Sequence, residues 1–154
     1  MLRLSKLADY SVVLLTTLAV RPNELVTAAQ LSERTKLPVP TVAKLLKKLA
    51  KSGHVNALRG AAGGYRLARM PDSISAASVI EAVDGPVRIV SCAGPEALPC
   101  EREVSCGIRG RWDPVNAIIR NALHNLTLAE MVGSTCQTPC SETKPVSSCM
   151  GCEG

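Results

Sequence analysis

The sequence predicts a mainly α-helical fold that carries one small β-hairpin. Three early segments place apolar residues at helical spacing, and a glycine-rich turn then separates two short segments of strand-like composition. A further long apolar stripe follows an irregular loop in the second half of the chain. At 154 residues the chain is long enough to bury one modest core and too short for a large enzyme.

The first predicted helix spans residues 5–20. Its apolar residues recur every three or four positions and also cover other faces, which indicates burial on more than one side: Leu7, Tyr10, Leu14 and Leu18, with Val12, Val13 and Leu15. Residues 21–23 break this pattern. Thr27 and Gln30 then form a capping box for a second helix, which we expect to end near Arg34.

A third helix follows a tight turn at residues 35–37, and Pro38 and Pro40 suit its approach and first turn. One side carries an apolar stripe that we expect to be buried, formed by Val42, Leu45, Leu46 and Leu49. The other side is predicted to face outward and carries Thr41, Lys44, Lys48 and Lys51. Two short helices joined by a tight turn, the second with a lysine-rich face, are typical of a helix-turn-helix.

Residues 55–59 and 65–69 are predicted to pair as a hairpin across the glycine-rich turn 60–64. A phosphate-binding loop is the alternative interpretation, but no GK[ST] motif follows these glycines and no long apolar strand precedes them. Three arginines in these segments suit contact with nucleic acid: Arg59, Arg66 and Arg69. Hairpin and helices together predict a winged helix-turn-helix domain over residues 1–86.

The charge of the chain favours a polyanionic partner. Lysine and arginine outnumber aspartate and glutamate by 18 to 13, which gives a formal net charge of +5. Lysines of the third helix would meet phosphates or bases, and arginines of the wing would reach an adjacent minor groove. The predicted DNA contacts are Thr41, Lys44, Lys48, Lys51, Arg59 and Arg66. The alternative for the lysines is a merely solvated basic helix face.

An amphipathic helix is predicted over residues 74–83, where Gly85-Pro86 stops it. Residues 87–112 then form a loop without a clear period, and we expect Trp112 to anchor this loop onto the core. The histidines His54 and His124 are interpreted as structural residues rather than ligands.

Asp113-Pro114 is a strong helix start. A long apolar stripe follows it, made of Val115, Ile118, Ile119, Ala122, Leu123 and Leu126. Thr127 with Glu130 caps a final short helix. From residue 133 onward serine, threonine, proline and glycine dominate, so residues 133–154 are predicted to be a flexible tail.

Seven cysteines lie in the second half of the chain, and three of them form a C-x7-C-x5-C pattern in the irregular loop, at Cys92, Cys100 and Cys106. Three thiolates in a loop suit an iron–sulfur cluster. A zinc site is the structural alternative, although zinc sites usually pair cysteines at shorter spacing. Three unrelated free thiols are the remaining alternative. The tail cysteines could form a separate zinc or redox site: Cys136, Cys140, Cys149 and Cys152.

The chain is expected to be cytoplasmic. It has no run of about 18 apolar residues and no signal-like order at its N-terminus. Because a reducing cytosol does not keep structural disulfides, the cysteines argue for metal or redox use.

Several of these segments together resemble the Rrf-two family of bacterial regulators, the IscR/NsrR/RirA-like proteins. They are the opening Leu2-Arg3-Leu4-Ser5-Lys6, the wing from Arg59-Gly60 through Gly63-Gly64-Tyr65-Arg66-Leu67-Ala68-Arg69, the three loop cysteines and Leu126-Thr127-Leu128. The resemblance covers about residues 1–132, and within the family the chain is most similar to regulators of Suf iron–sulfur cluster assembly. It implies a DNA-binding repressor of cluster-assembly or iron and redox stress genes. It also implies a homodimer in which the helix over 113–126 packs against its mate.

The resemblance also bears on a fourth cluster ligand. IscR-like members have a histidine three residues after the third cysteine, but this chain has Arg109, whose guanidinium cannot ligate iron. In the nitric-oxide-responsive branch an aspartate of the first helix, supplied by the partner subunit, completes a 4Fe–4S cluster. Asp9 resembles that residue, which favours 4Fe–4S with 2Fe–2S as the alternative. Asp9 is otherwise an ordinary first-turn aspartate favoured by the helix dipole.

The predicted organisation is a DNA-binding domain over 1–86, a cluster-binding loop over 87–112, a dimerisation helix with a short following helix over 113–132, and the tail. We expect no enzyme. The alternatives are a redox enzyme or cluster carrier that uses the cysteines directly, and a zinc-stabilised DNA-binding repressor. The first lacks a nucleotide fingerprint and a Cys-x-x-Cys at a helix start.

Overall fold

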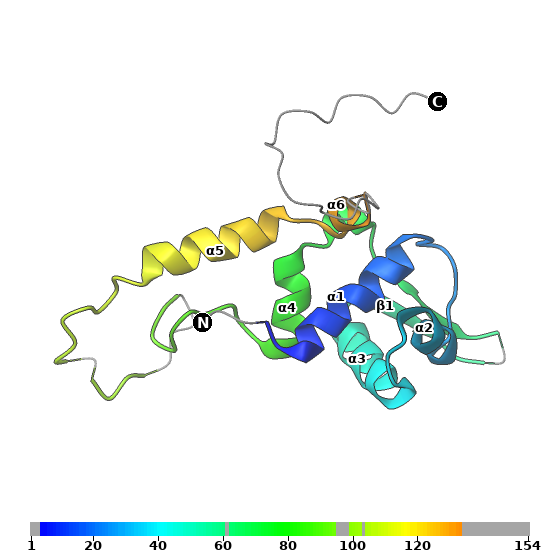
Figure 1. Ribbon diagram of the computed structural model, residues 1–154, viewed down its shortest axis with the longest axis horizontal. Helices are drawn as coiled ribbons and strands as arrows, with labels where there is room; N and C mark the ends of the chain where they lie inside the picture. Colours follow the sequence, from blue (N-terminus) through cyan, green and yellow to red (C-terminus); the bar gives the residue numbers. More distant parts are fainter. Residues whose placement is uncertain (1–3, 61, 95–98, 103, 134–154) are drawn as a thin grey trace, which may run out of the picture.

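The computed structural model describes residues 4–60, 62–94, 99–102 and 104–133. In chain order its elements are α1 (Lys6–Ala19), α2 (Ala28–Thr35), α3 (Val39–Lys51), β1 (Val55–Leu58), β2 (Gly64–Leu67), the 3₁₀ helix η1 (Pro71–Ser73), α4 (Ala76–Asp84), α5 (Asp113–Asn125) and α6 (Leu128–Gly133). The hairpin lies at one end of the molecule, and the long loop before α5 lies at the other (Figure 1). The predicted mainly helical fold with a small β-wing is confirmed.

The core forms where α1 packs against α3, α4 and α6. Leu14, Leu15 and Leu18 of α1 are fully buried, and Tyr10 packs partly against the same cluster, so the predicted burial of several faces is confirmed. The predicted stripe of α3 is also confirmed, because all four of its apolar residues are fully buried: Val42, Leu45, Leu46 and Leu49. The helix-turn-helix is therefore built into the core through the side of α3 that faces α1.

The hairpin pairs β1 and β2 in antiparallel register, from Val55 opposite Leu67 to Leu58 opposite Gly64. It is fastened to the helical body by a bridge between Tyr65 and Val26, whose backbone N–H and C=O groups bond at 2.9 and 2.8 Å. Gly64 allows this approach, because a Cβ there would lie 3.0 Å from the Val26 carbonyl oxygen. The strands are shorter than predicted, and the arginines at positions 59 and 69 lie outside them.

The last helix returns the chain to the core. α4 begins at Ala76 rather than at residue 74, because the Ser75 side chain caps it by accepting from the Ser78 N–H at 3.2 Å. The Ala76 N–H donates to the Leu126 carbonyl at 2.8 Å, which joins the end of α5 to the start of α4. Leu128 of α6 is fully buried. These contacts hold the carboxyl end of α5 on the body while the rest of the helix projects from it (Figure 1).

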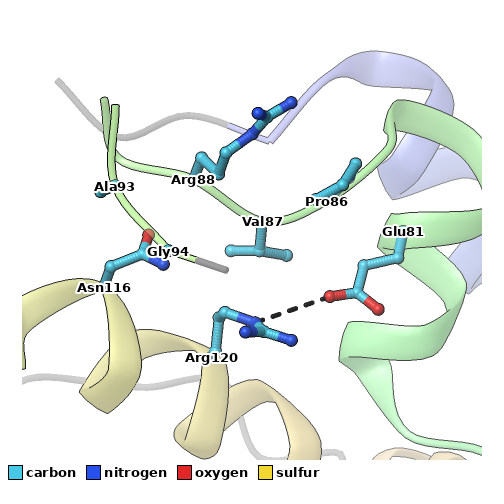
Figure 2. A pocket seen from close by; sticks show the side chains of 8 residues that line it. All are labelled: Glu81, Pro86, Val87, Arg88, Ala93, Gly94, Asn116 and Arg120. Atoms are coloured by element: carbon cyan, nitrogen blue, oxygen red, sulfur yellow. Dashed lines mark ion pairs between the residues drawn. The ribbon is translucent and has the colours of Figure 1, made fainter. Parts of the chain in front are cut away.

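Two polar side chains of α5 hold the loop that precedes it. Asn116, which is 2% exposed, accepts from the Ile89 N–H through Oδ1 at 3.1 Å. Asp113 Oδ1 accepts from the Gly94 N–H at 3.0 Å, and Figure 2 shows Asn116 beside that glycine. The prediction that Trp112 anchors the loop is wrong, because Trp112 is 40% exposed. The loop consists largely of backbone without apolar side chains, so amide and carboxylate acceptors hold it better than an indole does.

The predicted apolar stripe of α5 is largely uncovered. Among its residues, all of which are described, Asn116 alone is buried. Ile118 is 68% exposed and Val115 is 41% exposed. No helix within the described ranges is long and apolar enough to cross a membrane.

His54 locks the base of the hairpin to the helices and is structural, as expected. Its side chain is 3% exposed, with Nδ1 at 2.8 Å from the Ser52 hydroxyl and Nε2 at 3.2 Å from the Ser78 hydroxyl. Burial lowers the pKa of His54 below its ordinary value of 6.5, and the positive charge of Arg69 lowers it further. The folded state therefore keeps this imidazole neutral.

Replacing His54 with glutamine should reduce the loss of stability at acidic pH. Because the pKa is lower in the folded state, the contribution of neutral His54 is fully present above about pH 6.5 and is lost as the pH falls toward the folded-state pKa. Urea unfolding at neutral pH and near pH 5 measures this for both proteins. An identical loss of unfolding free energy in wild type and His54→Gln would contradict the assignment.

Candidate nucleic-acid interface and cysteine loop

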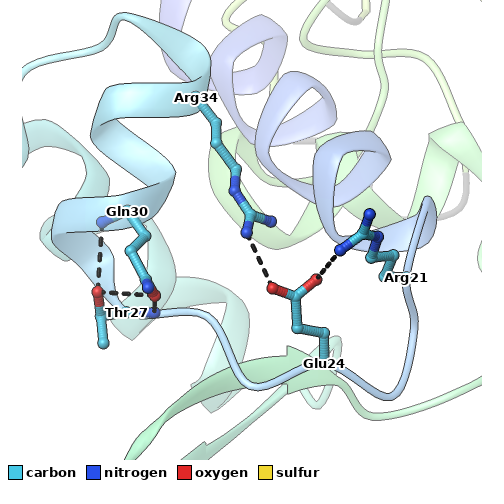
Figure 3. Close-up of polar contacts among 5 residues, drawn as sticks. All are labelled: Arg21, Glu24, Thr27, Gln30 and Arg34. Atoms are coloured by element: carbon cyan, nitrogen blue, oxygen red, sulfur yellow. Dashed lines mark hydrogen bonds and ion pairs between the residues drawn. The ribbon is translucent and has the colours of Figure 1, made fainter.

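The approach to α3 is held by caps and an ion-pair cluster. The predicted capping box of α2 is confirmed: the Thr27 hydroxyl accepts from the Gln30 N–H at 3.2 Å, and the Thr27 N–H donates to Gln30 Oε1 at 2.9 Å. Glu24 lies between Arg34 and Arg21, with nitrogen–oxygen distances of 2.9 and 3.7 Å (Figure 3). The hydrogen bond from Arg34 lowers the pKa of the Glu24 carboxyl. These contacts orient α2 against the segment that leaves α1.

The turn between α2 and α3 places Lys36 in the left-handed region, at φ +58°. A left-handed residue at a helix end redirects the chain sharply. α3 then starts at Val39, with Pro40 in its first turn as predicted.

The outward face of α3 is basic and carries no acidic residue. Lys44, Lys47 and Lys51 are exposed at i, i+3 and i+7, opposite the buried stripe. Thr41 is half-buried at the edge of this face. Sequence reasoning missed Lys47, although its spacing from Lys44 and Lys51 already places it on their face.

Lys48 departs from the expectation that it faces outward. It is half-buried, and its Nζ donates to the Val83 carbonyl at 3.1 Å. Position 48 lies on the flank of α3 that meets α4, where the last carbonyl groups of α4 have no partner within their own helix. A lysine suits this place because its charge also complements the negative end of the helix dipole.

A groove of about 460 Å³ lies between α3 and the hairpin. Its lining includes Lys47 on one side and Arg59 on the other, with Tyr65 and Thr27 between them. Arg59 and Arg66 are both exposed. The basic side chains of helix and hairpin thus border one concave surface, which matches the shape and charge that a polyanion requires.

The structure brings two of the three loop cysteines to one place. Cys92 and Cys100 line a hollow of about 520 Å³ together with Ser91, Pro99, Glu101 and Arg102. Cys106 is half-buried and is not among the residues that line it. Within the described ranges no three potential ligands are gathered closely enough to hold a metal ion. The donor set itself, three free thiols on an irregular loop, fits the chemistry of a thiolate-bound cluster.

Asp9 lies in the first turn of α1 and is exposed. It does not line the hollow of Cys92 and Cys100. The same end of α1 is tied to α4, because the Ser5 hydroxyl donates to Asp84 Oδ1 at 2.8 Å. The four tail cysteines and most of the predicted tail, residues 134–154, lie outside the described residues.

Two helices joined by a left-handed turn, followed by a hairpin with basic side chains, define a winged helix DNA-binding protein. Comparison with known proteins gives the family. A model described as "Iron-dependent Transcriptional regulator", named Rrf2, matches residues 4–134. The chain therefore belongs to the Rrf2 family of transcriptional regulators.

Individual relatives agree with this assignment. The chain is 33% identical over 134 residues to the HTH-type transcriptional regulator IscR of Erwinia tasmaniensis, which covers 86% of this chain and 80% of the relative. It is 30% identical over 135 residues to IscR of Cereibacter sphaeroides, with coverage of 85% and 87%. These relatives are regulators rather than enzymes, so the alternative of a redox enzyme is set aside.

Solved structures share the fold. CymR (YrzC), the global cysteine regulator of B. subtilis, superposes with a TM-score of 0.69 at 25% identity, covering 88% of this chain and 99% of that one. T. potens IscR superposes with a TM-score of 0.66 at 28% identity, covering 91% and 94%.

Proposed function

We propose that the chain reads operator DNA with α3 and the hairpin and represses genes of iron–sulfur cluster assembly or of iron and redox stress. The observation that carries this proposal is the acid-free lysine face of α3, bordered across one groove by Arg59. The proposed contacts are Thr41, Lys44, Lys47, Lys51, Arg59 and Arg66. Lys48 is not among them, because its ammonium group already serves α4.

Cys92, Cys100 and Cys106 are the proposed ligands of an iron–sulfur cluster, with Asp9 of the partner subunit as the fourth and 4Fe–4S as the favoured form. The iron-dependent description of the family and the three free thiols support this. Such a cluster supplies sensitivity to iron supply and oxidants. The chain's own part is to hold the loop on α5 through Asn116 and Asp113 while the cysteines remain accessible.

The proposed assembly is a homodimer that pairs α5 with its mate. The exposed apolar residues lie on one face of a helix that projects from the body: Val115, Ile118, Ala122 and Leu126. A helix face of this kind is stable when a second copy covers it. Two copies would present two α3 helices to successive major grooves of a palindromic site.

Salt dependence distinguishes the lysines that meet phosphate from Lys48. Lys44→Met and Lys47→Met should each flatten the plot of log affinity against log salt by about 0.9 per lost phosphate contact, hence about 1.8 for a dimer. Lys48→Met should leave the slope unchanged even where it weakens binding. Fluorescence anisotropy on a duplex selected from random sequence by the wild-type protein measures the slope. An equal change in slope for Lys48→Met would contradict the separation of roles.

Oxygen-free purification should yield coloured protein that contains iron and acid-labile sulfide. Alanine at Cys92, Cys100 or Cys106 should abolish both, and Asp9→Ala should lower cluster retention, whereas the tail variant Cys136→Ala is the matched control. Operator affinity of holo and apo protein at one salt concentration then tests the switch. Colourless protein with bound zinc would refute the cluster, and equal affinities would refute the switch.

Ile118→Asp should convert the dimer into a monomer. A carboxylate placed in an apolar interface loses hydration without gaining a partner, so association becomes unfavourable. Asn121→Asp, also exposed on α5 but away from the apolar face, is the control. Sedimentation equilibrium at micromolar protein measures the state, and a dimer that survives Ile118→Asp would place the interface elsewhere.

A further inference from the structure

We propose that a pocket between α4, the first part of the cysteine loop and α5 binds a small amino acid as its zwitterion. The pocket measures about 280 Å³, just below the range typical for drug-sized ligands, and therefore suits a small metabolite. It lies on the inner side of the loop, away from the hollow of Cys92 and Cys100. Its lining comprises Glu81, Pro86, Val87, Arg88, Ala93, Gly94, Asn116 and Arg120 (Figure 2).

The two charges in the pocket are imperfectly paired. Glu81 of α4 and Arg120 of α5 point toward one another, and Arg120 Nε lies 3.8 Å from Glu81 Oε1 (Figure 2). A direct charge-assisted hydrogen bond between such groups is about 2.7–2.9 Å long. Within the described part of the chain, Arg120 Nε is buried and makes no hydrogen bond. A guanidinium donor is therefore removed from water without a partner, which is the condition that a bound acceptor relieves.

The chemistry of the lining selects a zwitterion. A ligand carboxylate would accept from Arg120, and a ligand ammonium group would donate to Glu81, so both protein charges would gain a short partner. A purely anionic or purely cationic ligand would leave one of the two charges without compensation. Pro86 and Val87 provide an apolar wall for a short side chain.

Occupancy of this pocket would reach the cysteine loop directly. Gly94 and Ala93 line it, and Asn116, which also lines it, holds the Ile89 N–H. A ligand here would thus bind α4, α5 and the loop to one another and stabilise the folded protein by mass action. Only this regulatory consequence rests on the proposed function, whereas the binding site does not.

Calorimetric titration of the full-length protein without DNA tests the site. L-alanine, L-serine and L-threonine are the probes, and acetate and methylammonium each carry one half of the zwitterion. At least one amino acid should bind saturably at millimolar concentration, and both half-probes should bind about tenfold more weakly or not at all. Arg120→Gln and Glu81→Gln should each weaken binding by about tenfold or more, as for one lost charge-assisted hydrogen bond. Arg111→Gln, an exposed arginine outside the pocket, should leave it unchanged.

Amide chemical shifts of the wild-type protein provide a second measurement that does not depend on how the variants fold. The bound amino acid should shift the amide signals of Val87, Ala93, Gly94 and Asn116. Absence of saturable binding by all three amino acids overturns the proposal. So does binding that both substitutions leave intact, or shifts confined to other parts of the chain. Because no DNA or cluster readout is involved, either result leaves the proposed regulatory function standing.

Discussion

The last carbonyl groups of a helix need partners from outside the helix, and the way α4 meets this need organises the molecule. Lys48 reaches from α3 to the Val83 carbonyl, and Ser5 at the start of α1 donates to the neighbouring Asp84. Gly85, at φ +88°, then turns the chain into the loop that carries the cysteines. The basic helix, the first helix and the cysteine loop therefore meet at one helix end.

This arrangement gives a physical route between two distant surfaces. The basic groove faces one end of the molecule and the cysteine loop lies at the other (Figure 1). α4 spans the distance between them, and its carboxyl end touches elements of both. Any change that moves the loop relative to α5 acts on α4 through contacts that already exist, so no additional linking element is required.

The loop itself shows how a segment without a core is kept in place. Its anchors are the Asn116 amide and the Asp113 carboxylate, both of which accept backbone N–H groups. Neither depends on a bound group. This leaves Cys92 exposed and Cys100 and Cys106 half-buried, available to a ligand that the helices do not contact. The pocket beneath the loop, with its separated Glu81 and Arg120, lies between these same anchors and α4.

The sequence by itself determined everything that depends on near neighbours in the chain. Both capping boxes, the buried stripe of α3, the hairpin turn and the start of α5 obey rules that act within about four residues, and all appear as predicted. Only the tertiary structure decided which lysine of α3 faces solvent and which caps α4. It also decided that Asn116 rather than Trp112 holds the loop, and that a charged pair encloses a pocket. Those outcomes depend on which residues far apart in sequence lie side by side, because an orphan carbonyl, amide or guanidinium takes whatever partner packing brings within reach.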